Sequence, residues 1–257
     1  MSDRRGLAVE ERWLTIAGLR HFHRLAGEER AGTLPLVLLH GLGVSSAYWA
    51  RVLPLLAARR RVYAPDLPGF GQTDDPPYVP DSAAMARAMI AWLDRLGLGR
   101  VHLLAHSQGA QIASELADKW PERVASLVLA GVTLGKHDPT LPRLALRLLR
   151  DLPREWPSLL PVVGRGYLRA GPWRMVATNH VFNHEDSVAI VARLRVPILL
   201  VRGARDPVMT ARSLHALHQA APHARTLTIP GAAHALHWSH PRTLASYVNS
   251  FLADVER

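Results

Sequence analysis

The sequence predicts an α/β fold in which helices cover a mostly parallel sheet. Short apolar runs, of the kind found in buried strands, alternate with helical patterns along most of the 257 residues. One such run, residues 101–105, passes at Ser107 directly into a helical pattern, as a parallel strand followed by a helix does. A chain of this length can form one large domain with a sizeable core.

The elements expected before Ser107 follow from apolar runs and from the turn residues between them. The expected strands cover residues 12–18, 19–26, 34–41 and 62–66. The expected helices cover residues 47–58 and 82–96. The first two strands are expected to form an antiparallel hairpin, in which His21 and His23 share one face and point to solvent.

After Ser107 the alternation continues and is then interrupted. The later expected elements are helices at 108–120, 210–221 and 241–255 and strands at 123–130, 197–203 and 225–230. Residues 135–183 show no strand pattern and contain six prolines. We therefore expect a core domain, residues 1–134 and 192–257. A mobile helical lid, residues 135–191, is expected over the carboxyl edge of the sheet, where ligand sites of α/β proteins lie.

Composition argues against several classes of protein. The chain has no cysteine, so neither disulfides nor thiolate chemistry is expected, and its formal net charge is +10. No nucleic-acid-binding motif accompanies that charge, and the phosphate-binding patterns G-x-G-x-x-G and G-x-x-x-x-G-K-S/T are absent. The first residues lack the apolar core of a signal peptide, and no apolar run approaches the roughly 20 residues that cross a bilayer. We expect a cytoplasmic protein that binds no nucleic acid.

The turn at Ser107 has features that suit a nucleophile. A strand that turns directly into a helix bends sharply, and the residue at the apex takes a strained conformation above the sheet edge. Small residues leave room for the bend: Ala105 lies two positions before Ser107 and Gly109 two positions after it. The first N–H groups of the helix then face any negative charge that develops at the apex.

These residues, with four further motifs in the same chain order, resemble the α/β-hydrolase family. The string Ala105-His-Ser-Gln-Gly109 is similar to the family's G-x-S-x-G elbow, with alanine in place of the first glycine. The other matching strings are His40-Gly41, Asp66-Leu-Pro-Gly-Phe-Gly, Gly203-x-x-Asp206-Pro and Gly231-x-x-His234. The resemblance covers about residues 10–133 and 195–255, whereas the lid matches no pattern of the family.

The resemblance implies a catalytic triad of Ser107, Asp206 and His234, which occur in the family's chain order. His234 would accept the hydroxyl proton of Ser107, and Asp206 would hold the imidazole in the required tautomer. The backbone N–H groups of Leu42 and Gln108 would form the oxyanion hole. We expect the pKa of His234 to lie near neutrality, because the imidazole must be neutral to act as a base.

The substrate pocket is expected to use residues beside these motifs and in the lid. The candidates are His40, Gly41, Trp49, His106, Leu144, Leu148, Trp156, Trp173 and His237. His234, His237 and His240 recur every three residues and could also form a zinc-binding face. No carboxylate ligand lies near them in the sequence, so we expect no metal and no other cofactor. Asp66 is expected to act as a structural turn carboxylate.

A serine at the elbow is the nucleophile in hydrolysis of esters, thioesters and lactones. In related enzymes it serves carbon–carbon cleavage of meta-ring-fission products, but those enzymes usually have asparagine where this chain has His106. We predict hydrolysis of a small-molecule carboxylic ester with an apolar acyl group, through an acyl-enzyme intermediate. The alternatives are a carbon–carbon bond hydrolase and a non-catalytic ligand-binding protein of the same fold.

The first part of the lid is amphipathic. Its apolar stripe consists of Leu141, Leu144, Ala145, Leu148 and Leu149, and Arg143, Arg147 and Arg150 lie on the other side. From Lys136 to Arg174, eight basic and three acidic residues give a net charge of +5. The stripe is expected to roof an acyl pocket, and the arginines suggest an additional weak contact with an anionic membrane.

Overall fold

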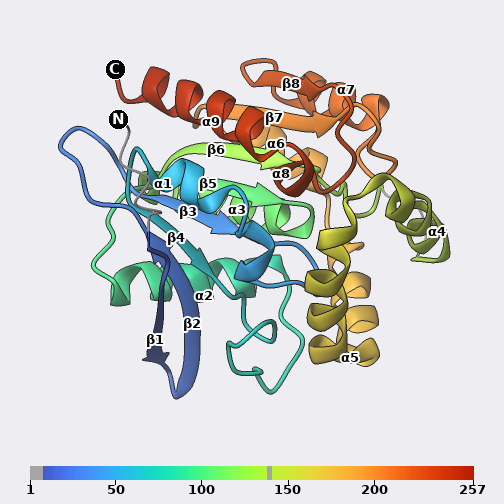
Figure 1. The fold of residues 1–257 in the computed structure, drawn as a ribbon, viewed down its shortest axis with the longest axis horizontal. Coiled ribbons are helices and arrows are strands. Elements are labelled where there is room, and N and C mark those ends of the chain that lie inside the picture. The colour runs from blue at the N-terminus through green and yellow to red at the C-terminus, as the bar shows by residue number, and fades with distance from the viewer. Residues whose placement is uncertain (1–7, 138–140) are drawn as a thin grey trace.

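The computed structural model of the chain describes residues 8–137 and 141–257, and within them eight strands form one sheet (Figure 1). The strands are β1 (Glu10–Ile16), β2 (Leu19–Ala26), β3 (Leu36–Leu39), β4 (Val62–Pro65), β5 (Val101–His106), β6 (Val124–Ala130), β7 (Ile198–Gly203) and β8 (Arg225–Ile229). Their order across the sheet is β1-β2-β4-β3-β5-β6-β7-β8. β2 pairs antiparallel with β1 and β4, and every other neighbouring pair is parallel. The predicted mostly parallel sheet with an antiparallel N-terminal hairpin is confirmed.

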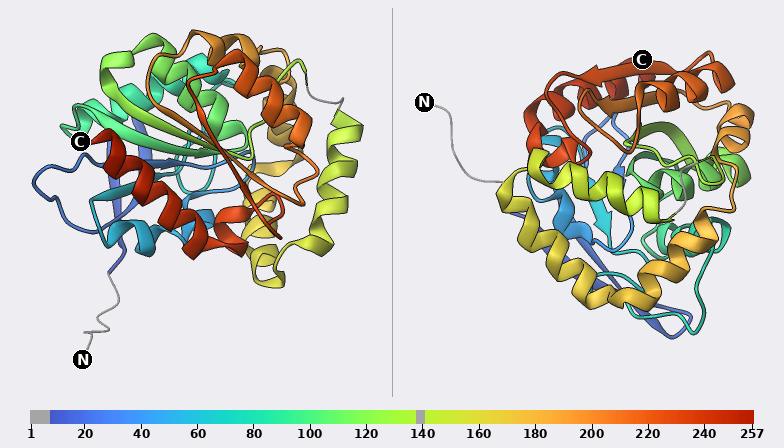
Figure 2. Two further views of the ribbon diagram at one scale, coloured as in Figure 1. Left: turned by 90° about the horizontal axis from the view of Figure 1, so that it is seen from above. Right: turned by 90° about the vertical axis from the view of Figure 1, so that its right-hand side faces the viewer.

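Helices cover both faces of the sheet (Figures 1 and 2). One face carries α2 (Ser82–Arg95), α3 (Gln108–Lys119), α6 (Ser187–Arg193) and α7 (Ala211–Ala220), and the other carries α1 (Leu53–Ala57) and α9 (Pro241–Val255). Alternate side chains of the central strands enter the two apolar layers: Leu103 packs in the first and Leu104 in the second. Burial on both faces explains why these strands are continuous apolar runs in the sequence.

The expected helix over residues 47–58 is broken into two shorter pieces. Residues Ser46–Trp49 form a 3₁₀ turn, η1, and α1 begins only at Leu53. Pro54 lies in the first turn of α1, where a helix tolerates its missing N–H, so it favours the start of a new helix at this point.

The structure corrects the expectation that His21 and His23 face solvent, since both side chains are buried. β2 has a hydrogen-bonded neighbour on each side and is therefore not an edge strand. The His23 ring packs edge-on against Trp92 of α2, with 5.4 Å between the ring centroids. Burial lowers the pKa of His23 to about 4, so this imidazole is a neutral part of the core.

The lid helices lie beyond the carboxyl ends of the parallel strands. α4 (Leu141–Asp151) crosses this edge, and the two halves of α5 (Leu160–Phe182) form a V beside it (Figure 2, right). The V arises at Gly171, where a φ of 73° interrupts the helix just before Pro172. α6 packs instead against α3 and α7. Residues 187–191, which the sequence analysis placed in the lid, therefore pack with the core helices.

Two short 3₁₀ turns, η3 (Leu152–Arg154) and η4 (Pro157–Leu159), connect α4 to α5. The prolines at the start of both turns and of α5 supply the fixed φ that a helical first turn needs. In the part of the chain that the structure describes, no helix is both long enough and apolar enough to cross a membrane.

Candidate active site

Ser107 forms the junction between β5 and α3. Its φ of 55° and ψ of −126° lie in a region that residues with a side chain rarely adopt. The bend depends on Gly109, because a Cβ there would lie 2.5 Å from the carbonyl oxygens of Leu39 and His40. Ala105 is fully buried in the core, where its single methyl group is accommodated. The strained turn therefore forms although the first glycine of the usual elbow is absent.

The loop after β3 carries its backbone close to Ser107. A Cβ added to Gly41 would lie 3.1 Å from the Cβ of Ser107, so a larger residue would crowd the serine. Leu42 follows in this loop, and Gln108 is the first residue of α3; both line one cavity with Ser107. Neither backbone N–H donates to an acceptor among the described residues. Both groups remain candidates for an oxyanion hole.

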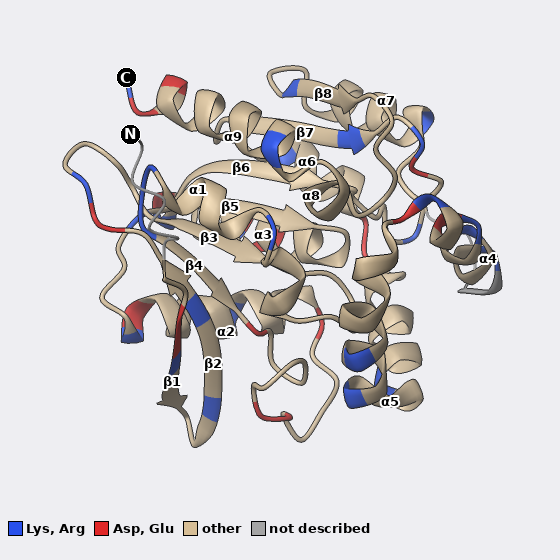
Figure 3. Cartoon of the chain, viewed as in Figure 1, with Lys and Arg blue, Asp and Glu red and all other residues tan. Residues whose placement is uncertain are grey.

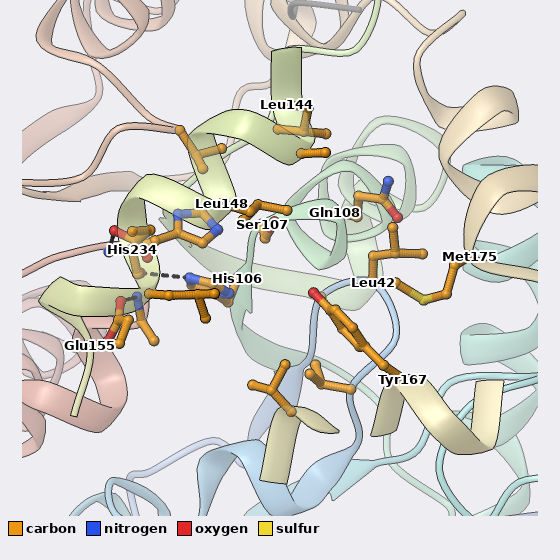
Figure 4. A pocket seen from close by; sticks show the side chains of 18 of the residues that line it. Leu42, His106, Ser107, Gln108, Leu144, Leu148, Glu155, Tyr167, Met175 and His234 are labelled. Carbon is orange, nitrogen blue, oxygen red and sulfur yellow. Dashed lines mark hydrogen bonds between the residues drawn. The ribbon is translucent and has the colours of Figure 1, made fainter. Parts of the chain in front are cut away.

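His234 and Asp206 come together from the loops after β8 and β7. His234 Nδ1 lies 2.9 Å from Asp206 Oδ2. The other carboxylate oxygen, Oδ1, accepts hydrogen bonds from the backbone N–H groups of Val208 at 2.7 Å and Met209 at 3.0 Å. With Asp206 fixed at both oxygens, the imidazole is held by Nδ1 and its ring is directed toward Ser107 (Figure 4).

His106, the residue before Ser107 and the last residue of β5, contacts the loop that carries His234. Its Nε2 lies 3.0 Å from the backbone oxygen of His234 (dashed in Figure 4), and the two ring centroids are 4.6 Å apart. Burial lowers the pKa of His106 to about 3, so the ring is neutral and the nitrogen at the carbonyl must carry the proton. His106 thus ties the end of β5 to the candidate base.

Two carboxylates of the lid reach the same loop, and the sequence analysis missed both. Glu155 Oε1 accepts a hydrogen bond of 2.6 Å from the N–H of Ala235, and Asp151 Oδ1 lies 3.5 Å from the backbone nitrogen of His234. Burial raises the pKa of Glu155 to about 7, although the Ala235 N–H opposes the shift; burial also raises the pKa of Asp151. No sequence signal marks these residues, because only the folded lid brings them to His234.

The surrounding carboxylates control the protonation of His234. Burial by itself lowers the pKa of His234, but Asp206 and then the lid carboxylates outweigh burial and raise that pKa to about 9. For Asp206, burial acts in the opposite direction and raises the pKa of the carboxyl group. His234 and the two backbone donors outweigh burial and hold this pKa below its usual value. The expectation of a histidine with a pKa near neutrality is therefore revised toward alkaline pH.

A cavity of about 440 Å³ opens in front of Ser107 (Figure 4). The predicted pocket residues that line it are Gly41, His106, Leu144 and Leu148. Lining residues that the prediction missed include Val44, Tyr48, Leu152, Leu160, Tyr167, Met175, Val176 and Asn179. Most of the missed residues belong to the lid, whose fold no motif indicated. The Leu141 side chain, also predicted for the apolar stripe, lies outside the described part of the structure.

Five predicted pocket residues lie outside the cavity: His40, Trp49, Trp156, Trp173 and His237. His40 is buried behind the loop, where its Nδ1 donates to the Gly41 oxygen and its Nε2 accepts from the Leu67 N–H, each at 2.9 Å. Trp156 and Trp173 lie on the outside of the lid, with 49% and 78% of their surface exposed. Helical spacing could not reveal which side of each lid helix faces the core.

His237 is buried behind the cavity rather than beside the substrate. Its ring centroid lies 4.1 Å from that of Tyr48 and 4.7 Å from that of Trp49. The His240 ring instead contacts the hydroxyl of Ser239 at 3.0 Å. The zinc-binding face drawn from His234, His237 and His240 therefore does not form. Among residues 8–137 and 141–257, no group of three or more His, Asp or Glu side chains is placed to hold a metal ion.

Asp66 occupies the position expected of a structural turn carboxylate. Its Oδ1 accepts from the Ser46 N–H at 2.6 Å, and its Oδ2 accepts from the Gln72 N–H at 2.7 Å. Both oxygens are used in holding loops next to the site, and Asp66 does not line the cavity at Ser107.

The fold agrees with comparison of the chain with known proteins. Residues 36–247 match the model of the alpha/beta hydrolase family, and the chain belongs to this family. The structure is similar to that of a thermophilic esterase from Thermogutta terrifontis, with a TM-score of 0.81 over 96% of this chain and 100% of that one. Sequence identity to that esterase is 21%, so this likeness concerns the fold alone.

Two curated relatives have more specific descriptions. The chain is 30% identical over 246 residues to a pimeloyl-acyl-carrier-protein methyl ester esterase of Nitrosomonas europaea, covering 85% of this chain and 96% of the relative. It is 40% identical over 133 residues to a 2-hydroxy-6-oxononadienedioate/2-hydroxy-6-oxononatrienedioate hydrolase of Pseudomonas putida, covering 48% and 46% of the two chains. An alpha/beta hydrolase with esterase relatives is the class that these similarities define.

Proposed function

We propose that the protein is a serine hydrolase that cleaves carboxylic esters through an acyl-enzyme intermediate. The observation that carries the proposal is the position of Ser107, at a strained turn in the same cavity as a histidine bonded to a carboxylate. A serine hydroxyl is a weak nucleophile, and this arrangement supplies both a base and an orienting acid. Similarity to a methyl ester esterase over most of the chain supports the same reaction class.

In the proposed reaction, Ser107 Oγ attacks the ester carbonyl carbon while His234 Nε2 takes the hydroxyl proton. The carbonyl oxygen becomes an oxyanion, which the N–H groups of Leu42 and Gln108 stabilise. Collapse of this intermediate breaks the bond to the alcohol oxygen, which leaves with the proton from His234. Water then attacks the acyl-serine with His234 again as base, which releases the carboxylic acid and restores the Ser107 hydroxyl.

The proposed substrate carries an apolar acyl group, because lid leucines form much of the cavity wall. Leu144 and Leu148 project from α4 toward the cavity, and Met175 and Tyr167 face it from α5 (Figure 4). Burying such a chain against apolar side chains contributes about 0.8 kcal/mol for each methylene group.

The proposal is tested with a fluorophosphonate probe and a panel of p-nitrophenyl esters of increasing acyl length. We expect covalent labelling at Ser107 and turnover of the esters. A meta-ring-fission product tested in parallel addresses the alternative that the similarity to the Pseudomonas hydrolase suggests. Cleavage of that compound with little ester turnover would favour the carbon–carbon hydrolase, and absence of labelling and of both activities would favour the non-catalytic binding protein.

Enlarging a lid residue should shorten the preferred acyl chain. Leu148→Trp fills part of the cavity, so each methylene group that it excludes is expected to lower kcat/KM about fourfold. The ester panel measures this shift as a change in the optimum length. The matched control is Leu146→Trp on the same helix, since Leu146 is 46% exposed and does not line the cavity. Equal shifts in both variants would mean that the inward face of α4 does not set the preferred length of the acyl group.

Ester turnover should rise with pH into the alkaline range. His234 must be neutral to accept a proton, and neighbouring carboxylates raise its pKa to about 9. In Glu155→Gln a nearby negative charge can no longer form, so the protonated imidazole is less stabilised and the pKa of His234 falls. The rising limb of the kcat/KM profile is therefore expected to move to lower pH, while Glu122→Gln, at an exposed remote site, leaves it unchanged. A shift to higher pH would contradict this electrostatic assignment.

A further inference from the structure

Exposed apolar side chains are concentrated on the lid. Of thirteen large apolar residues that are exposed in the described chain, nine belong to α4, α5 and the turns between them. They are Leu146, Leu149, Leu152, Trp156, Leu160, Tyr167, Leu168, Trp173 and Val176. Leu168 and Trp173 keep 87% and 78% of their surface in solvent. Exposed apolar side chains gathered in one region mark a surface that contacts another apolar phase or molecule.

Part of this set surrounds the entrance to the cavity. Five of the nine exposed residues also line the cavity of Ser107, and we call them the rim: Leu149, Leu152, Leu160, Tyr167 and Val176. The rim draws on α4, on η3 and on both halves of α5, so it lies on several sides of the opening. The exposed apolar surface is thus continuous with the wall of the proposed acyl pocket.

The outward charge of the lid is positive. Arg143, Arg150 and Arg154 lie on or next to α4, Arg165 and Arg169 lie on α5, and all five are exposed. Figure 3 shows the basic segments of both helices in blue. None of these five guanidinium groups forms an ion pair with a described residue. The two acidic residues between Leu141 and Phe182, Asp151 and Glu155, instead turn inward to the His234 loop. On α4 the exposed face therefore combines leucines with unpaired cations, whereas Arg165 and Arg169 of α5 line a second pocket beside Arg24 and Gln72.

We propose that this lid face docks on the surface of an anionic lipid bilayer, with the rim directed into the lipid. Arginines attract anionic headgroups, while leucines and tryptophans enter the interfacial region, which is the arrangement of helices that lie on membranes. Each basic side chain near such a surface strengthens binding by a factor of about five. The entrance to the Ser107 cavity then opens toward acyl chains in the membrane.

A second copy of this chain fits the same face less well. A symmetric dimer through the lid would place the arginines of one copy against those of the other, and like charges oppose such a contact. An anionic bilayer supplies the opposite charge and an apolar layer together. Charge complementarity thus selects the bilayer over the self-complementary dimer.

The test is cosedimentation of the full chain with vesicles at low salt. The vesicles contain either phosphatidylcholine alone or phosphatidylcholine with phosphatidylglycerol. Because the Ser107→Ala variant is used, neither hydrolysis nor the correctness of the proposed function affects the measurement. We expect binding to the anionic vesicles, little binding to the neutral ones, and a marked loss of binding in high salt. No sedimentation with anionic vesicles at low salt would overturn the proposal.

Paired variants locate the surface. Arg143→Glu with Arg150→Glu is expected to weaken binding to anionic vesicles by more than about twentyfold, since two attractive charges become repulsive. The matched control reverses Arg59 and Arg95, which are exposed at the ends of α1 and α2, away from the lid. Trp173→Ala should reduce the binding that persists in salt. Equal losses in the control would reject the lid as the docking face.

Two further measurements separate the remaining alternatives: light scattering detects dimers, and polyglutamate competition detects a site for an acidic protein. If the lid face were an interface between copies, the protein would form dimers that Trp173→Ala dissociates, and vesicles would not be bound. If it were a site for an acidic protein, polyglutamate would compete at low salt, and vesicle binding would not depend on Trp173. Either outcome would overturn the membrane proposal.

Discussion

Replacing Ser107 with alanine is expected to lower kcat for ester hydrolysis by a factor on the order of 10⁴ to 10⁶. The variant removes one oxygen atom, the proposed nucleophile, and leaves the His234–Asp206 pair in place. Alanine keeps the same Cβ at a φ of 55°, so the strain of the turn and the packing around it are unchanged. The measurement combines single-turnover hydrolysis of a p-nitrophenyl ester with a thermal melt, which should match that of the wild type.

The matched control for this variant is Ser114→Ala. Ser114 is a buried serine of α3, next to the site in sequence, whose hydroxyl donates to the carbonyl of Ala110 at 2.8 Å. Its loss should change stability modestly and leave turnover and fluorophosphonate labelling intact. Turnover by folded Ser107→Ala at close to the wild-type rate would remove Ser107 from the mechanism, whatever its geometry.

The sequence predicts the core better than the lid because the core repeats simple patterns. Buried parallel strands such as β3 are apolar on both faces. The predicted helix over residues 82–96 forms as α2, where the Asp81 side chain caps it by accepting from the Ala84 N–H at 2.7 Å. The bend at Ser107 is visible in the sequence because Gly109 meets two carbonyl oxygens that leave no space for a Cβ. A local backbone requirement of this kind can be predicted from the identity of a single residue.

Packing between distant segments has no such signature. His23 looks like an exposed strand residue until β4 pairs with β2 and Trp92 covers its ring. The sequence predicts Trp156 and Trp173 as pocket residues, yet both face outward. Trp173 follows the kink at Gly171, which sets the side of α5 that meets the core, and Trp156 lies in the turn just before η4. The inward turn of Glu155 toward Ala235 joins residues 80 positions apart in the chain. These features follow from tertiary contacts that composition and periodicity do not encode.

The two buried histidines at the end of the Ser107 site should respond differently to truncation. His234→Ala removes the proposed base, so kcat for ester hydrolysis is expected to fall by a factor on the order of 10⁴ to 10⁶. The backbone of residue 234 would still accept from His106, so the loop is expected to keep its position. The buried Asp206 carboxylate loses its partner, so turnover is measured below the melting temperature of the variant.

His237→Ala tests packing instead of proton transfer. Burial, reinforced by His106 and His234, holds the pKa of His237 well below its usual range, so this ring stays neutral and does not titrate during turnover. It does not line the cavity, but it fills the space between Tyr48 and Trp49. Truncation should therefore lower the melting temperature, because it leaves a void in a packed aromatic cluster. Turnover should fall far less than in His234→Ala, and a loss of kcat in His237→Ala with full activity in His234→Ala would mean that His237 is the base.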